Sequence, residues 1–387
     1  MTSRHLRHQP YRILKISTMV KLIDLTYYAH LEYNHPEQVM KRQHEALGFV
    51  TFIRPPMHLE VVKHLNFEGF TQHHGVQFSF FKKTNHFWSI PFKTHRYLKK
   101  QNPDVVLVQG LVFPLQVIFL RLALGGQRKI VVQHHGERPY PGLKSVFQKL
   151  ADRCIDAYIF TAAGNASPWV QSGFISSWSK IHEVLEASTD MAIQNKEEAR
   201  RKLGLEGAFN FLWVGRLNAN KDPLTVLKAF SEYQHINRAA RLFLIYQEQD
   251  LLAAVKSIIQ SQGLEQVVNL VGKMPREDIA SWYSAADYYI SASHQEGSGY
   301  ALLEAMACGC VPIVTDIAPF RKITGGGQYS LLFKPGDDAG LLTCLRSLAG
   351  VNQQQWSEAI RQHFTRNLSF KAIAENLSAM VVSLVSK

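Results

Sequence analysis

Cysteine is scarce in this sequence, and the few cysteines present are not spaced as redox partners or metal ligands. Cys154, Cys308, Cys310 and Cys344 form no CxxC pair in the 387 residues. This use of cysteine fits a protein of a reducing compartment, such as the cytoplasm. The sequence therefore predicts no metal site built on cysteine.

A signal core and a long apolar run are also lacking. We expect residues 1–18 to form a basic, poorly ordered leader, with Met19 as an alternative start. The segment 105–120 holds no charged residue, but it contains a Gln-Gly pair and a proline and falls short of the ~20 residues that a membrane span needs. We interpret it as a buried strand, a turn and a helix to about Leu124, with a membrane span as the alternative.

Internal repeats and low-complexity tracts are absent as well, and the length exceeds that of one ordinary domain. An apolar content of 46% supplies a full core, so disorder of the whole chain is excluded. We expect an N-terminal Rossmann-like domain over 19–187, a linker over 188–208, a C-terminal Rossmann-like domain over 209–365 and a C-terminal helix over 366–387.

Short apolar runs alternate with helical patterns in the first half, which is typical of a parallel, doubly wound α/β sheet. The runs expected to be strands are Val20–Leu25, Phe49–Ile53, Val105–Val108, Ile130–Val132 and Tyr158–Thr161. Aromatic residues and histidines crowd together between Pro55 and Pro91, and the pattern assigns no elements there.

The second half alternates more regularly. The expected strands are Phe211–Val214, Arg241–Tyr246, Val267–Leu270, Tyr288–Ser291 and Val311–Val314. The expected helices are Lys196–Leu203 in the linker, Pro223–Tyr233, Leu251–Gln262, Arg276–Ala285 and Ala301–Cys308, with further helix in 353–387. This alternation predicts a second Rossmann-like domain.

Two cations follow the first strand of that second series. In Val214-Gly-Arg-Leu-Asn-Ala-Asn-Lys221 the strand ends at Gly215, and Arg216 and Lys221 stand five residues apart. Ligands of such sheets bind at the carboxyl ends of the strands, where an Arg fork and a Lys charge can clamp a diphosphate. The alternative is a pair of exposed surface cations beside a turn.

A second motif, His294-Gln-Glu-Gly-Ser-Gly-Tyr-Ala-Leu-Leu-Glu304, places Glu296 and Glu304 on either side of a glycine-rich turn. Its glycines let the backbone approach a ligand closely, and the helix that begins near Tyr300 presents N–H groups that attract phosphate. A diphosphate would repel both carboxylates, so we expect them to accept hydrogen bonds from sugar hydroxyls. The alternative is one glutamate at a helix start and one solvated on the helix.

The second motif is followed directly by Ala305-Met-Ala-Cys-Gly-Cys-Val-Pro312. Together, the two motifs and this segment resemble the retaining GT-B glycosyltransferases of family 4, the glycosyl transferases group 1. The resemblance covers most of 209–340. The resemblance implies an α/β fold of two Rossmann-like domains facing across a cleft, with C-terminal helices crossing back to the first domain. It implies that Arg216 and Lys221 bind the donor diphosphate. Glu296 would hold the transferred sugar and Glu304 the ribose.

Further positions follow from the same resemblance. Main-chain groups after Gly299, at Tyr300, are implied to touch phosphate or sugar. Lys273 and Met274 fall where that family lays the nucleotide base against backbone.

The first half contains a segment, Ile130-Val-Val-Gln-His-His-Gly-Glu137, that is similar to the histidine site of this family. We assign the family's histidine site to His135 rather than His134, because strand alternation should turn one of the two side chains inward. A structural histidine is the alternative. Glu137 and Arg138 are expected to line the acceptor side.

Two segments depart from the family pattern. The glycine-rich loop that many members carry after the first strand is replaced by Thr26-Tyr-Tyr-Ala-His-Leu-Glu-Tyr-Asn34, which has no glycine. A Gly-x-Gly of the second domain is replaced by Tyr246-Gln-Glu-Gln-Asp250. The first departure points to another phosphate contact or to acceptor binding, and the second concerns recognition of the base.

The activity implied by the resemblance is retaining transfer of a sugar from a nucleoside diphosphate sugar to a glycan or lipid-linked acceptor. Arg216, Lys221 and the helix N-terminus would stabilise the leaving diphosphate without a bound metal or cofactor. The alternatives are a GT-B-fold epimerase or phosphorylase and, in another class, a basic protein that binds nucleic acid or a membrane without catalysis. We expect no nucleic-acid partner, since no recognition-helix, RRM or zinc pattern is present.

Charge is distributed unevenly along the chain. Residues 1–190 carry a net charge of +10 and the rest +2, and 14 of the 17 histidines lie in the first part. A basic cluster stands among aromatic residues: Lys82, Lys83, Lys93, Arg96, Lys99 and Lys100 beside Phe78, Phe80, Phe81, Phe87, Trp88 and Phe92. This composition suits a segment that rests on an anionic membrane surface, so we expect a cytoplasmic protein that docks on the inner membrane face. The alternative is a solvated basic face over core aromatics.

Overall fold

The computed structural model describes residues 19–386, apart from residues 31, 43–46, 83–87, 143, 206 and 208. The chain divides into two compact units. Residues up to Glu186 and from Ile373 onward make up the N-terminal unit, and Ala187–Ala372 make up the C-terminal unit. The expected leader, residues 1–18, lies outside the described part.

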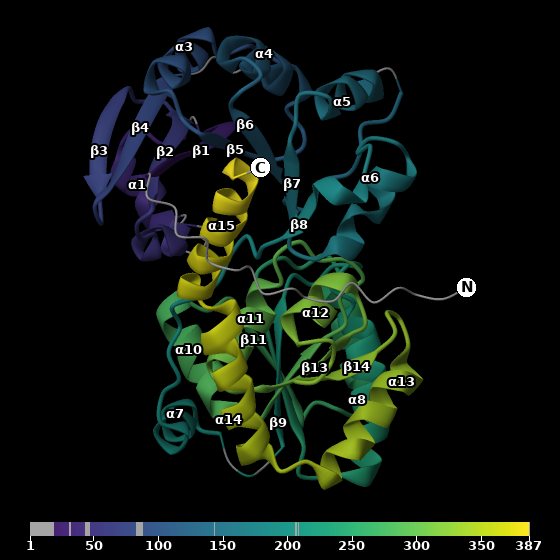
Figure 1. The fold of residues 1–387 in the computed structure, drawn as a ribbon. Helices are drawn as coiled ribbons and strands as arrows, with labels where there is room; N and C mark the ends of the chain where they lie inside the picture. Colours follow the sequence, from purple (N-terminus) through teal and green to yellow (C-terminus); the bar gives the residue numbers. More distant parts are fainter. Residues whose placement is uncertain are drawn as a thin grey trace. The chain divides into compact units, whose positions relative to one another are not determined.

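An eight-stranded sheet with the order β3-β4-β2-β1-β5-β6-β7-β8 forms the centre of the N-terminal unit (Figure 1). Its neighbouring strands run parallel, except for the antiparallel pair β3 and β4. The strands are β1 Val20–His30, β2 Met57–Leu65, β3 Gly69–His73, β4 Val76–Lys82, β5 Val105–Gln109, β6 Lys129–Gln133, β7 Ala157–Phe160 and β8 Ile181–Glu183.

Helices pack around this sheet, and α4 contacts both α3 and α5. The helical elements of the unit are α1 Pro36–Arg42, η1 Gly48–Phe52, α3 Phe92–Gln101, α4 Pro114–Leu124, α5 Lys144–Asp152, η2 Ala163–Ala166, α6 Ser167–Gln171 and η3 Trp178–Lys180. The last helix, α15 Phe370–Val385, belongs to the N-terminal unit from Ile373 onward, as the resemblance implied.

The strand expected at Phe49–Ile53 is wrong. These residues form the short helix η1, and the strand that pairs with β1 is β2. A short apolar run does not distinguish a buried strand from a buried helical turn. In β2, by contrast, buried Glu60, Lys63 and His64 interrupt the apolar pattern that would have marked a central strand.

The first strand is also longer than expected, because β1 runs to His30 and takes in the first part of the glycine-free segment 26–34. Thr26 and Tyr27 are buried, and the Tyr27 hydroxyl is 2.9 Å from Nε2 of His95. β-Branched and aromatic residues favour strands, so this stretch extends the sheet instead of forming a loop for phosphate.

The segment 105–120 folds as β5, a turn and the start of α4, which confirms the strand-turn-helix interpretation over a membrane span. One helical stretch in the described part, 353–385, is long and apolar enough to cross a membrane by length and composition. Its residues Ile373, Leu377 and Val381 are buried, and core helices meet the same criterion.

Six parallel strands with the order β11-β10-β9-β12-β13-β14 form the sheet of the C-terminal unit. The strands are β9 Asn210–Gly215, β10 Arg241–Tyr246, β11 Val268–Gly272, β12 Tyr288–Ser291, β13 Val311–Thr315 and β14 Leu331–Phe333. The expected strands from 211 to 314 are therefore confirmed within one or two residues at their ends.

The helices of this unit pack as two groups, α8 with α9 and α13, and α10 with α7 and α11. They are α7 Lys196–Leu203, α8 Pro223–Ile236, α9 Leu252–Ser261, α10 Arg276–Ala285, α11 Tyr300–Ala307, α12 Ala318–Ile323, α13 Asp338–Ser347 and α14 Gln353–His363, with the turns η4 Leu348–Gly350 and η5 Phe364–Leu368.

Strand order reverses once in each sheet, and this determines where a ligand can bind. In the C-terminal sheet the chain leaves β9 toward β10 and β11 and later returns to β12 on the other side of β9. In the N-terminal sheet the corresponding reversal lies between β1 and β5. Ligands of open α/β sheets bind beyond the carboxyl ends of the strands at such reversals.

Candidate functional site

Both candidate motifs of the C-terminal unit emerge at its strand reversal. The loop after β9 carries Arg216 and Lys221, and the loop after β12 carries Glu296. The two loops are joined by hydrogen bonds, since Asn220 donates to the Gln295 carbonyl (3.0 Å) and accepts from the Gln295 N–H (3.1 Å). The structure therefore brings the two motifs together on one edge.

A further contact anchors these loops to helix α8. Asp222 caps α8 by accepting from the Thr225 N–H at 3.2 Å, and its other oxygen lies 3.1 Å from His294 Nε2. The His294 N–H donates to the Asn220 carbonyl at 2.8 Å. Capping of this kind positions the first turn of α8 beside the loop that holds the cations.

Lys221 and Glu296, assigned to adjoining parts of one ligand, contact each other. The Lys221 Nζ donates to Glu296 Oε1, and the side chains are 25% and 13% exposed. A lysine at this position lowers the cost of placing a carboxylate near a diphosphate. The pair leaves each partner able to exchange this contact for a ligand atom.

Glycine is required at position 299, where helix α11 begins. Gly299 has φ +65°, and a Cβ there would lie 2.8 Å from Cδ1 of Ile323. Tyr300 is the first helical residue and is half-buried. The N-terminus of α11 thus sits on the same loop as Glu296, and the helix dipole favours an anion there.

Glu304 lies one turn into α11 and is held by two side chains of α10. Its Oε2 accepts from the Tyr283 hydroxyl at 3.1 Å, and its Oε1 lies 3.8 Å from Nη1 of Arg276. Arg276 also bonds Asp190 at 3.2 Å. Burial raises the pKa of the Glu304 carboxyl, and Arg276 and the Tyr283 hydroxyl offset this in part. Glu304 is thus a positioned hydrogen-bond acceptor.

Arg216 follows Gly215 at the end of β9 and faces the loop that replaces the family's Gly-x-Gly. Its Nε lies 3.5 Å from Oε1 of Glu248, and both side chains are largely exposed. The Leu217 N–H donates to the Glu248 carbonyl at 3.1 Å, which joins the two loops. Arg216 therefore has an acidic neighbour that a phosphate would displace or compete with.

Lys273 and Met274 lie farther along the same edge. They follow β11, which is separated from β9 by β10. Lys273 is exposed and Met274 half-buried, and Gly272 before them has φ +83°. Their main chain, rather than their side chains, is what the resemblance assigned to the nucleotide base.

The two histidines after β6 point in different directions, as strand alternation predicts. His134 is buried and stacks on Phe160, with ring centroids 4.6 Å apart. Its Nδ1 accepts from the Gly136 N–H (3.3 Å), and its Nε2 donates to the Glu137 carbonyl (3.1 Å). Burial lowers the pKa of His134, so it is a neutral structural histidine.

His135 turns outward to the carboxyl edge of the N-terminal sheet. Its Nδ1 bonds the Glu186 carboxylate, and its Nε2 lies 2.7 Å from Oε1 of Gln109. Burial lowers the pKa of His135, but Glu186, Glu137 and Asp24 outweigh it and raise the pKa above its usual value.

Glu137 joins two loops of this edge. Its carboxylate accepts from the N–H groups of Leu111 (3.1 Å) and His135 (2.6 Å). Gly110 has φ +94°, and a Cβ there would lie 2.9 Å from Glu137 Oε1. Glu137 therefore has a structural task here beside any contact with an acceptor, whereas Arg138 is exposed.

Sequence reasoning did not find Arg276, Tyr283, Glu248, Gln109 or Glu186 as site residues. Arg276 and Gln109 could have been found, because each stands at or just after the carboxyl end of a strand. Glu186 had no such signal, since its partner His135 lies 51 residues earlier. Within the described residues, no group of three or more His, Cys, Asp or Glu is arranged to hold a metal ion.

About half of the chain is similar to curated proteins that are named as sugar-phosphate synthases or glycosyltransferases. Mannosylfructose-phosphate synthase of Agrobacterium fabrum is 29% identical over 195 residues, which cover 48% of this chain and 43% of that protein. GDP-mannose:cellobiosyl-diphosphopolyprenol alpha-mannosyltransferase of Xanthomonas campestris is 26% identical over 234 residues, 59% of this chain and 60% of that protein. The chain spans about half the length of the curated relatives it matches.

Solved structures match almost the whole chain. A glycosyltransferase from Rickettsia africae aligns with a TM-score of 0.72 at 16% identity and covers 95% of this chain and 99% of its own. Anabaena HepE in complex with UDP aligns with a TM-score of 0.69 at 15% identity and covers 94% and 100%. Residues 195–363 match the family model described as Glycosyl transferases group 1. The chain therefore has the GT-B fold of these structures, and its segment 195–363 is similar to the Glycosyl transferases group 1 family.

Proposed function

We propose that this protein is a retaining glycosyltransferase that moves a sugar from a nucleoside diphosphate sugar to a glycan or lipid-linked acceptor. The observation that carries the proposal is the joining of the two loops at the β9–β12 reversal. At that junction Lys221, on the loop after β9, contacts Glu296, on the loop after β12. Glu304 lies one turn along α11, the helix that follows the second loop.

The donor would be held from its two ends. Glu304, fixed by Tyr283, accepts from ribose hydroxyls, and Glu296 accepts from hydroxyls of the transferred sugar. The diphosphate between them meets Arg216, Lys221 and the N-terminus of α11. These groups stabilise the negative charge that grows on the leaving diphosphate, and the proposal needs no bound metal.

Two relatives support the substrate classes. HepE binds UDP and, in another structure, UDP-glucose. The Xanthomonas mannosyltransferase acts on a cellobiosyl-diphosphopolyprenol, which is a lipid-linked acceptor. We carry both classes over to this chain as substrates to be tested.

A panel of nucleotide sugars tests the function directly. We expect one donor class to raise the melting temperature and to be slowly hydrolysed without an acceptor, and both effects should survive EDTA. A Glu304→Ala variant should lose the thermal shift. Sugar release as a free epimer, or release that depends on phosphate as co-substrate, would favour the epimerase or phosphorylase alternative.

We also propose that the protein docks on an anionic membrane surface through helix α3, which is part of the cluster named from the sequence, together with helices α4 and α5. Phe78, Phe80 and Phe81 of that cluster are buried core residues of β4, so they do not face a membrane surface. Lys83 and Phe87 lie outside the described residues. Six of the exposed apolar side chains of the N-terminal unit lie on helices α3, α4 and α5.

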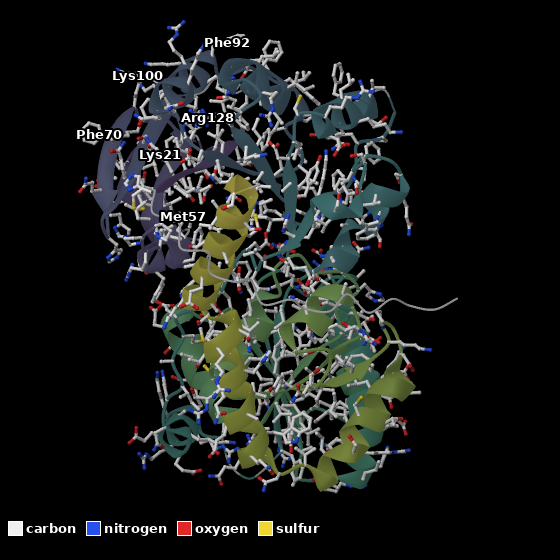
Figure 2. All side chains as sticks on the ribbon, viewed as in Figure 1. Lys21, Met57, Phe70, Phe92, Lys100 and Arg128 are labelled. Carbon is white, nitrogen blue, oxygen red and sulfur yellow. The ribbon has the colours of Figure 1, made fainter. Side chains whose placement is uncertain are left out.

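These three helices combine exposed apolar side chains with positive charge. The exposed apolar residues are Phe92, Phe119, Leu122, Val146, Phe147 and Leu150. The helices carry seven Lys or Arg residues and one carboxylate, that of buried Asp152. Phe92 packs edge-on against Phe119 at 6.0 Å, and Figure 2 labels Phe92 and Lys100 at the two ends of α3. This combination suits the headgroup region of an anionic bilayer.

Vesicle co-sedimentation tests the docking surface. Binding should require anionic lipid and fade with salt, because each Lys near the surface adds ~1 kcal/mol that salt screens. Replacing Lys99, Lys100, Lys144 and Lys149 by Gln should weaken binding by two orders of magnitude or more. The matched control replaces exposed Lys228 and Lys256 of the C-terminal unit and should bind like wild type. Equal binding to neutral and anionic vesicles would contradict the proposal and favour a soluble acceptor.

A further inference from the structure

A chain of hydrogen bonds crosses the carboxyl edge of the N-terminal sheet at its strand reversal. Buried Asp24 on β1 accepts from the side-chain amide of Gln109 on β5 at 2.8 Å. The side-chain amide oxygen of Gln109, Oε1, faces Nε2 of His135 at 2.7 Å. His135 Nδ1 in turn meets the carboxylate of Glu186, whose side chain is 5% exposed. The chain therefore runs from a buried carboxylate, through an amide and an imidazole, to a second buried carboxylate.

The orientation of the Gln109 side-chain amide determines which ring nitrogens of His135 carry a proton. Its NH₂ group can only donate and its oxygen can only accept. Because the Asp24 carboxylate takes the NH₂ group, the oxygen is left for His135, and an oxygen acceptor requires a proton on Nε2. The Glu186 carboxylate oxygen that meets Nδ1 is likewise an acceptor, so Nδ1 also carries a proton. Both ring nitrogens of His135 then donate, which is the hydrogen-bonding state of an imidazolium.

We propose that Gln109 and Glu186 are positioning residues that hold His135 as an imidazolium, a fixed positive charge at the carboxyl edge of the N-terminal sheet. This inference rests on the proposed function for its purpose, since that charge favours an anionic oxygen of donor or acceptor. Because both N–H groups are engaged inside the unit, His135 acts through its charge and not as a general acid or base.

The other charged groups around the ring agree with this assignment. Glu137 lies beside His135 on its own loop and accepts from its backbone N–H. Lys63 on β2 is buried and contacts Thr26 at 3.4 Å, and it interacts with Asp24 across the sheet. Burial lowers the pKa of Lys63 and raises that of Asp24, and each charge offsets this shift in the other. His134 is neutral and adds no competing charge. The His135 side chain is 39% exposed, and a cation there balances the buried Glu186 carboxylate.

Nuclear magnetic resonance of protein labelled with [15N]histidine tests the proposal without reference to activity. His135 is identified by the signal lost in His135→Gln, and its two nitrogens are followed between pH 5.5 and 9. We expect both nitrogens of the wild type to be protonated at pH 7.5. In Glu186→Gln, which keeps an acceptor oxygen but removes the charge, the imidazolium should become the minority form at that pH. Gln109→Met should also move the titration midpoint to lower pH.

The control is Glu68→Gln, which removes a surface carboxylate that pairs with Lys93 in the same unit and should leave the His135 titration unchanged. A neutral His135 at pH 7.5 in the wild type would overturn the proposal, as would an unchanged midpoint in Glu186→Gln. Should Glu186→Gln fail to fold, the wild type and Gln109→Met still decide the question. If the titration is as proposed but no nucleotide sugar is turned over, only the proposed function fails.

Discussion

The carboxyl edges of the two sheets hold their polar clusters in different ways. At the C-terminal edge Arg216 is 64% exposed, and Lys221 and Glu296 are joined by one contact on open loops. At the N-terminal edge Asp24 and Glu186 are buried and belong to a continuous hydrogen-bonded chain. Groups of the first kind can exchange their partners for a ligand at low cost. Groups of the second kind keep their partners and fix a charge state.

The largest effect should follow from removing a cation of the open edge. We expect Arg216→Ala and Lys221→Ala each to lower kcat by about 10²- to 10³-fold with little change in KM, because leaving-group charge grows toward the transition state. Steady-state kinetics with the donor identified by the panel measures this. Lys273→Ala, a cation farther along the same edge, should change kcat less than tenfold. A change confined to KM would contradict this, because it would show that the cations bind the ground state and the transition state equally.

A smaller effect concerns the N-terminal unit, whose stability should fall at acid pH because of buried His95. Burial lowers the pKa of His95 to about 4, with a further contribution from His64. Its neutral form thus stabilises the fold above the usual histidine pKa of 6.5, and this stability is lost as pH falls toward 4. The loss amounts to about 3 kcal/mol at most.

Urea unfolding at several pH values checks this expectation. The free energy of unfolding of the wild type should fall between pH 7 and pH 4.5, and His95→Gln should be less stable at pH 7 but flatter over that range. His235→Gln, near the surface end of α8 in the C-terminal unit, is the control. Parallel pH curves for wild type and His95→Gln would remove His95 as the cause.

The smallest effect tests how tightly the N-terminal edge is packed. Gly110→Ala combines a positive φ with a Cβ only 2.9 Å from Glu137 Oε1, so we expect a destabilisation of about 2–3 kcal/mol. Gly75→Ala has a similar φ of +78° but open space around the Cβ, so it should cost about 1 kcal/mol. Urea denaturation compares the two. Equal costs would mean that Glu137 moves aside freely and does not fix the edge.

The C-terminal fold could be predicted from the sequence because its periodicity is undisturbed. β10, α10 and β12 have the expected bounds, since no charged residue is buried inside these three elements to interrupt the strand and helix patterns. In the N-terminal unit β2 buries Glu60, Lys63 and His64, and these residues hide a central strand. An apolar pattern predicts a buried strand only where the strand buries apolar residues. It fails where polar side chains are buried and form hydrogen bonds with one another inside the core.

The candidate site divides in the same way. Arg216, Lys221, Glu296 and Glu304 lie in short contiguous motifs, and the family resemblance that these motifs carry implied a nucleotide-sugar site. Alternation along β6 separated inward His134 from outward His135. The partners of His135 could not be predicted, because Gln109 and Glu186 come from elements 26 and 51 residues away and meet it only in the folded sheet.

The central claim is that the joined loops at the β9–β12 reversal form a donor site in which Glu304 holds the ribose and Glu296 the transferred sugar. Calorimetric titration of the bare nucleoside diphosphate into wild type, Glu304→Ala and Glu296→Ala tests it most directly. We predict that Glu304→Ala loses about 1.5–3 kcal/mol of binding free energy, the value of hydrogen bonds to a charged acceptor, while Glu296→Ala binds nearly as wild type and loses turnover. Equal loss of nucleotide affinity in both variants would contradict the account.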